Sequence, residues 1–189
     1  PGGEVLGRIG GGPDCLVVVD EAYMEFWNES VLDCVEKYDN LMVLKTCSKA
    51  LRMAGIRCGL AIANAALTRA LQAAKSPYNV NSMTQAAAEA MFDYPEELKA
   101  ASRAVIQSRD ELYHAVTALA QKYPGRLSLL PTAANFVFIR FPEGQARRIF
   151  EGMKTDGVVV RCMGDSLRIT CGTKAENDEV VRLLEGYLS

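Results

Sequence analysis

Long apolar runs and a strong charge of either sign are both missing from this sequence of 189 residues. No apolar run approaches the length that spans a bilayer, and no basic segment followed by an apolar one stands at the start. These absences argue against a membrane or secreted protein, and we expect a soluble, cytoplasmic one. The formal net charge of -2 gives no indication of a surface for nucleic acid.

Histidine is nearly absent, and no two cysteines form a C-x-x-C pair. His114 is the only histidine of the chain. The six cysteines lie far apart, at positions 15, 34, 47, 58, 162 and 171. This spacing argues against a zinc site, so we expect no metal and interpret the cysteines as reduced, mostly buried thiols.

The most informative segment that is present covers residues 46–59 and reads T-C-S-K-A-L-R-M-A-G-I-R-C-G. Lys49, at the end of an apolar strand, can form a Schiff base with a carbonyl compound. Arg57 and the hydroxyls of Thr46 and Ser48 supply donors for a phosphate group. The cofactor that needs an amine and a phosphate site at this separation is pyridoxal 5′-phosphate (PLP).

A second segment upstream fits the same cofactor. The branched residues 16–19 predict a buried parallel strand that ends at Asp20. A carboxylate at this place can pair with the protonated pyridine nitrogen of PLP, and Tyr23 can donate to its phenolic oxygen. Asp20 as a helix cap and Tyr23 as a packing residue are the alternatives.

Together these motifs carry a resemblance to a known family. V-V-V-D-E-A-Y (17–23) and T-x-S-K-x-x-x-x-A-G-x-R-x-G (46–59) resemble the fold-type I PLP-dependent aminotransferases. Within these, the chain is most similar to the histidinol-phosphate aminotransferases. Further matches are N-F-V-F (135–138), V-R (160–161) and L-R-I-T-C-G-T (167–173). The lysine motif is specific for the superfamily, and the C-terminal matches are less specific for the subfamily.

The resemblance implies roles for three residues near the C-terminus. Residues 166–169 alternate so that Arg168 points opposite to its neighbours, which predicts an inward-facing arginine that needs an anion. The family makes that anion the substrate α-carboxylate. Arg161 would bind the phosphate of a phosphorylated amino substrate or would be a surface residue. Asn135 would orient the substrate or would serve a turn.

The predicted fold class is α/β, with the aspartate aminotransferase (fold type I) architecture of PLP-dependent transferases. Residues 1–92 would be the C-terminal part of the large PLP-binding domain. Residues 93–189 would form a small α+β domain that includes a long interdomain helix from Pro95 to about Tyr123. Within the first part we expect a helix over residues 29–38, capped by Asn28.

The start of the chain predicts that further sequence precedes it. Residues 1–5 are turn residues without a preceding element, and in the family this position follows an N-P-x-x-P-x-G loop. We therefore expect the C-terminal part of a longer protein. The absent part would hold the first strands, the glycine-containing phosphate loop and the aromatic residue that stacks on the cofactor.

The resemblance predicts PLP-dependent transamination of histidinol phosphate, or a similar amino substrate, with a 2-oxo acid in histidine biosynthesis. The full-length protein would be a homodimer, with small molecules as its other partners. Threonine-phosphate decarboxylase and aromatic-amino-acid aminotransferase are alternative activities with nearly the same motifs. A fourth alternative is an inactive fragment that cannot complete the cofactor site.

Overall fold

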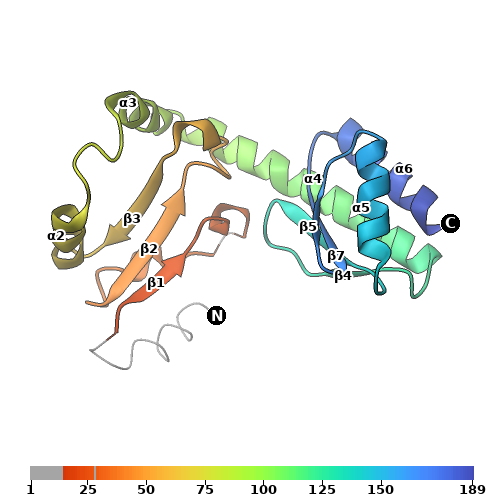
Figure 1. Ribbon diagram of the computed structural model, residues 1–189. Helices are drawn as coiled ribbons and strands as arrows, with labels where there is room; N and C mark the ends of the chain where they lie inside the picture. Colours follow the sequence, from red (N-terminus) through yellow and green to blue (C-terminus); the bar gives the residue numbers. More distant parts are fainter. Residues whose placement is uncertain (1–14, 28) are drawn as a thin grey trace. The chain divides into compact units, whose positions relative to one another are not determined.

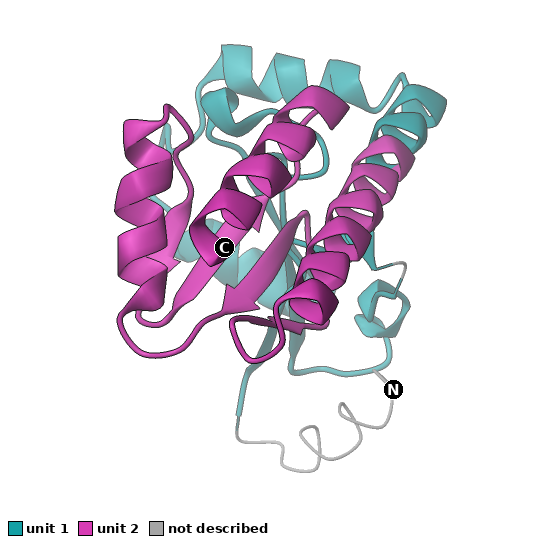
Figure 2. Cartoon of the chain, turned by 90° about the vertical axis from the view of Figure 1, so that its right-hand side faces the viewer, with its two compact units in different colours: residues 1–102 teal, residues 103–189 magenta. Residues whose placement is uncertain are grey.

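The computed structural model describes residues 15–27 and 29–189. The chain forms two compact units, residues 1–102 (unit 1) and 103–189 (unit 2), coloured teal and magenta in Figure 2. The boundary between them along the chain falls within helix α4 (Pro95–Lys122). The domain boundary that the sequence predicts after residue 92 stays a prediction.

Unit 1 contains a three-stranded sheet in which β2 (Leu41–Thr46) lies between β1 (Val17–Asp20) and β3 (Gly59–Ala63) (Figure 1). β1 and β2 are parallel, as the apolar run of β1 predicts, and both therefore end at the same edge of the sheet. β3 is antiparallel to β2. It returns directly from the segment after Thr46, because an antiparallel neighbour needs no crossover helix.

Two short helices follow the sheet, and each begins at an asparagine. Asn64 caps α2 (Ala65–Ala74) and accepts from two backbone N–H groups, as expected. Asn81 caps α3 (Ser82–Met91) and accepts from one backbone N–H, that of Thr84. Residues 82–92 are rich in alanine and methionine, which predicts a buried helix, but Met83 is 83% exposed and only one side of α3 is buried.

The prediction of a helix over residues 29–38 is wrong. Only the 3-10 turns η1 (Met24–Phe26) and η2 (Leu32–Cys34) occur between β1 and β2. The backbone N–H of Val31 donates to a carboxylate oxygen of Glu21, which holds this segment beside the end of β1. Asn28, the expected cap, and residues 1–14 lie outside the described residues.

The predicted burial of the first strand holds for one face only. Val17 is buried, whereas Leu16 and Val18 are 53% and 48% exposed. Successive strand residues face opposite sides, and β1 is the edge strand of the sheet that the structure describes.

Unit 2 contains a four-stranded antiparallel sheet in the order β4-β5-β7-β6. Its strands are β4 (Ser128–Leu130), β5 (Phe136–Arg140), β6 (Arg161–Met163) and β7 (Ser166–Thr170). The strand expected over 158–161 begins only at Arg161. The Val158 N–H instead donates to Met153, and Gly157 adopts a φ of 88°, so this segment completes the end of the preceding helix.

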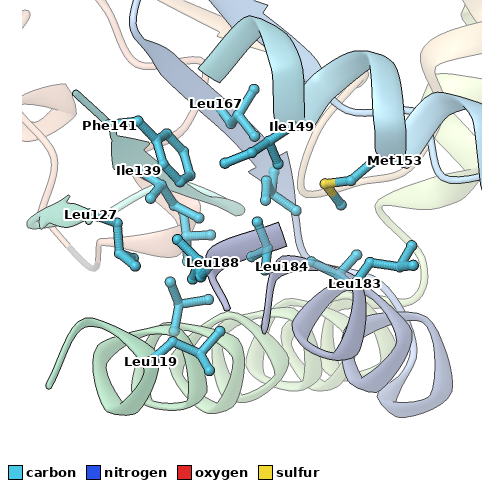
Figure 3. Packing of buried hydrophobic residues seen from close by; sticks show 14 of the residues in the cluster. Leu119, Leu127, Ile139, Phe141, Ile149, Met153, Leu167, Leu183, Leu184 and Leu188 are labelled. Atoms are coloured by element: carbon cyan, nitrogen blue, oxygen red, sulfur yellow. The ribbon is translucent and has the colours of Figure 1, made fainter. Parts of the chain in front are cut away.

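Three helices bury one face of this sheet. α4, α5 (Gln145–Thr155) and α6 (Lys174–Leu188) direct apolar side chains at one another and at the strands (Figure 3). The strand residues in this core alternate along the chain, as expected for a sheet with one buried face: Val137, Ile139, Leu167 and Ile169. The predicted capping box of Thr173 and Glu176 at the start of α6 is confirmed.

No helix in the described part of the chain combines the length and the apolar character that a membrane span requires.

Leu167 offers a direct test of this core. Its side chain is 0% exposed. Leu167→Ala should therefore lower the free energy of unfolding by about 2–5 kcal/mol, because it removes buried apolar area and leaves a cavity. Val159 is 74% exposed, and Val159→Ala should change the stability by less than about 0.5 kcal/mol. Hydrogen exchange of the β5 and β7 amides, followed by mass spectrometry, measures both. Unchanged protection in Leu167→Ala would contradict the core described here.

Candidate active site

The carboxyl ends of β1 and β2 create an edge that can hold a ligand. Asp20 lies opposite Leu44 in the parallel ladder, and the N–H of Glu21 extends the pairing by donating to the Leu44 carbonyl at 2.8 Å. β2 then runs directly into the segment that contains Lys49. Open α/β sheets bind their ligands at the carboxyl ends of parallel strands.

Lys49 and Tyr23 meet at this edge. The Lys49 ammonium lies 5.7 Å from the centroid of the Tyr23 ring. Both residues are half-buried, so the amine rests on an aromatic face and stays within reach of solvent. The sequence placed both residues in one site, and the structure brings them together.

The phosphate-binding candidates lie where the β2–β3 hairpin ends. The Thr46 hydroxyl accepts a hydrogen bond from the Ser48 N–H at 3.1 Å. Arg57 is exposed, adopts a left-handed φ of 57°, and donates to the Ala54 carbonyl at 2.9 Å, which closes the 3-10 turn η3 (Ala54–Ile56). Joint binding of a phosphate by these three groups stays a prediction.

Asp20 is exposed and takes part in a local turn. Its Oδ1 accepts a hydrogen bond from the Ala22 N–H at 2.9 Å. This contact resembles the capping role that the sequence left open, although it caps a turn and not a helix. The pairing of Asp20 with a pyridine nitrogen stays a prediction.

A buried ion cluster lies directly beside these residues, and the sequence analysis did not identify it. Glu21 is 0% exposed and accepts from the Ser30 hydroxyl and the Val31 N–H, each at 2.7 Å. Lys45 lies 3.0 Å from Glu21 and 2.9 Å from Glu25. A charged residue at the end of the apolar strand β2 was a signal, because a half-buried lysine needs a partner.

The two charges of this cluster stabilise each other. Burial raises the pKa of Glu21, but hydrogen bonds from Ser30 and Val31 and the charge of Lys45 together bring it below the ordinary 4.5. Burial lowers the pKa of Lys45, and Glu25 and Glu21 outweigh this and raise it above 10.5. The cluster therefore stays ionised at neutral pH and ties the end of β1 to the end of β2.

In unit 2, Arg161 and Arg168 lie directly opposite each other on β6 and β7. Paired strand residues have Cβ atoms about 5 Å apart, and like charges directly opposite each other are unfavourable for a sheet. The Arg168 guanidinium lies 4.9 Å from the Phe136 ring centroid. Its buried Nε has no hydrogen-bond partner among the described residues.

One part of the prediction for Arg168 is confirmed, its direction opposite to its neighbours, and the other part, that it faces inward, is wrong. It does point opposite to Leu167 and Ile169, but these two neighbours fill the core and Arg168 faces the other side of the sheet. Successive side chains of a strand point to opposite faces, so a residue between two core residues faces away from the helices. A cavity of about 710 Å³ is lined by Arg161, Arg168 and the first half of α6.

Asn135 precedes β5 and is half-buried. Its carbonyl accepts from the Cys171 N–H at 3.0 Å, which continues the pairing of β5 with β7. This backbone contact leaves both alternatives for its side chain open.

Comparison with known proteins identifies the family. Residues 13–184 match the model of the aminotransferase class I and II family, and the chain belongs to it. The chain is 38% identical to the histidinol-phosphate aminotransferase of Clostridium kluyveri over 100% of its own length. It is 36% identical to histidinol-phosphate aminotransferase 2 of Burkholderia lata, again over its whole length. In both cases it covers 54% of the relative, so the chain spans about half the length of these curated relatives.

Solved structures confirm the predicted fold class. Histidinol-phosphate aminotransferase from Sinorhizobium meliloti, solved with pyridoxal-5′-phosphate, superposes with a TM-score of 0.84 at 24% identity. The match covers 100% of this chain and 53% of that one. L-threonine-O-3-phosphate decarboxylase from Porphyromonas gingivalis gives 0.83 at 23% identity, over 98% of this chain and 59% of that one. The fold is therefore the fold-type I architecture that the motifs indicated.

The ion cluster makes a prediction about stability. Glu21→Gln should destabilise unit 1 by about 3 kcal/mol, because it removes the buried negative charge that pairs with Lys45 and leaves Lys45 with Glu25 alone. The stabilisation by Glu21 is present above pH 4.5 and is lost as the pH falls through its lowered pKa. The stabilisation by Lys45 is present below pH 10.5 and is lost as the pH rises through its raised pKa.

Trp27 is the only tryptophan and lies in unit 1, so its fluorescence during urea unfolding reports on this unit alone. Glu36→Gln, at an exposed position, is the matched control and should stay within about 0.5 kcal/mol of the original chain. Equal midpoints for the two variants would contradict the role given to the cluster.

Proposed function

We propose that this chain carries the PLP-binding lysine of an aminotransferase, and that Lys49 is that lysine. The observation that carries the proposal is the contact of Lys49 with Tyr23 at the carboxyl edge of β1 and β2. The family match and the PLP-containing relative from Sinorhizobium meliloti support it. The matched relatives are about twice as long as this chain, so we assign the catalytic activity to a protein of that full length.

The residues at this edge fit the cofactor by their chemistry. Lys49 would hold the cofactor aldehyde and would later move the proton at the substrate α-carbon. Asp20 would place a fixed negative charge at the pyridine nitrogen, and Tyr23 would donate to the phenolic oxygen. Thr46, Ser48 and Arg57 would hold the phosphate. Bound PLP supplies the electron-withdrawing ring that stabilises negative charge on the α-carbon.

For the substrate, we propose an amine that carries an anionic group, such as histidinol phosphate, with a 2-oxo acid as the other partner. Arg161 and Arg168 form a doubly positive pair without an anion among the described residues. Relatives named for histidinol phosphate at 36–38% identity favour this substrate. A phosphoamino acid decarboxylase is the second candidate, because such an enzyme shares the fold and would need the same arginine pair.

Borohydride trapping tests the role of Lys49. The chain is mixed with PLP, reduced and digested with trypsin. We expect a pyridoxyl group on peptide 46–52, because trypsin does not cleave after a modified Lys49. Lys49→Ala should lose this label completely, and Lys75→Ala, at an exposed lysine of unit 1, should keep it. Equal labelling of Lys49 and Lys75 would refute the assignment.

Anion binding tests the arginine pair. Arg168→Gln and Arg161→Gln should each weaken binding of histidinol phosphate about 10- to 100-fold, because each loses a charge-assisted hydrogen bond of about 1.5–3 kcal/mol. Titration calorimetry measures the affinities, and histidinol without its phosphate gives the contribution of the anionic group. Arg147→Gln, which loses an exposed pair with Glu151 and a contact with the Phe150 ring, should bind as the original chain does. Unchanged affinity in both strand variants would make the pair a surface feature.

A further inference from the structure

Cys47 and Cys58 face each other where the β2–β3 hairpin ends. The last pair of the ladder is Thr46 with Gly59, and the next step brings Cys47 opposite Cys58. The Cys47 N–H donates to the Cys58 carbonyl at 3.1 Å, which continues the ladder to this pair. Hydrogen-bonded pairs of antiparallel strands have Cα atoms about 5.5 Å apart. Disulfides most often join Cα atoms about 5.5–6 Å apart.

The two cysteines lie opposite each other at the strand ends and differ in access to solvent. Cys47 is 0% exposed, whereas Cys58 is half-buried. Burial raises the pKa of the Cys47 thiol to about 11, and its hydrogen bond with the Cys58 thiol contributes to this rise. At neutral pH Cys47 is therefore a protonated thiol next to a more accessible one. The Cys58 thiol also contacts the Gly59 carbonyl at 4.0 Å, and in unit 2 the thiols of Cys162 and Cys171 likewise contact backbone carbonyls.

We propose that Cys47 and Cys58 form an intramolecular disulfide when the protein reacts with a hydroperoxide. The Cys58 sulfur attacks one peroxide oxygen, the O–O bond breaks, and Cys58 becomes a sulfenic acid while an alcohol or water leaves. The Cys47 sulfur then attacks the Cys58 sulfur, the S–S bond forms, and water leaves with the Cys47 proton. In total, two thiols are oxidised to a disulfide and one peroxide is reduced.

The disulfide would close a covalent ring over residues 47–58. This ring contains Ser48, Lys49 and Arg57, all candidates for cofactor binding. A disulfide also fixes the side-chain torsions of both cysteines, so oxidation would restrict the conformations that this loop can adopt. We expect the oxidised chain to capture PLP several-fold less well. This consequence rests on the proposed function, whereas the disulfide itself does not.

Peptide mapping of the full chain tests the disulfide. The protein is treated with hydrogen peroxide, free thiols are alkylated, and trypsin cleaves after Lys45, Lys49, Arg57 and Arg69. We expect peptides 46–49 and 58–69 to appear joined, with a mass lower by two hydrogens, and to separate on reduction. Recovery of both peptides as alkylated thiols, as sulfinic acids, or joined to other cysteines would overturn the proposal.

Two variants make the test specific. Cys58→Ser should leave Cys47 alkylated after peroxide treatment, and Cys34→Ser, at another half-buried thiol of unit 1, should form the cross-link as before. Borohydride trapping of PLP on the reduced and the oxidised chain then tests the consequence. Equal trapping in the two states would refute the effect on the cofactor. Trapping in neither state would refute the PLP site of this chain and would leave the disulfide result standing.

Discussion

The parallel pairing of β1 with β2, fixed by the buried ion pair of Glu21 and Lys45, is the constraint on which the candidate site depends. Because both strands end at one edge, Asp20 and the segment after Thr46 leave the sheet together. The carboxylate of Glu21 also accepts from the Val31 N–H, so it orders the chain between the strands. One buried side chain thus contacts the end of β2 and the segment between the two strands.

In unit 2 the strand period has the corresponding role. Leu167 and Ile169 bind the sheet to its helices, and the residue between them must then face the other side. The antiparallel register of β6 and β7 places Arg161 opposite Arg168 on that free face. Backbone pairing thereby places two arginines on neighbouring strands at the same position of the sheet. An anion bound there would offset both positive charges.

The sequence predicted the parts of the structure that follow from local patterns. The capping box of Thr173, the cap of Asn64 and the alternation in β5 and β7 each depend on a few neighbouring residues. It failed where a distant group decides. Residues 29–38 form a 3-10 turn in place of the expected helix, and the Val31 N–H bonds to Glu21, ten residues upstream. The face of Arg168 depends on which side the helices cover, and a strand pattern alone does not contain that information.

The same limit separates two lysines that lie four residues apart. Lys45 is bound by two carboxylates, so its amine cannot reach a ligand unless both ion pairs break. Lys49 instead rests on the ring of Tyr23, a weaker contact that an aldehyde can displace. The motif predicts that Lys49 is the reactive lysine, and the contacts of the two amines fit this prediction. Lys45 satisfies the buried carboxylate of Glu21, whereas the amine of Lys49 lies on the Tyr23 ring at the edge of the sheet.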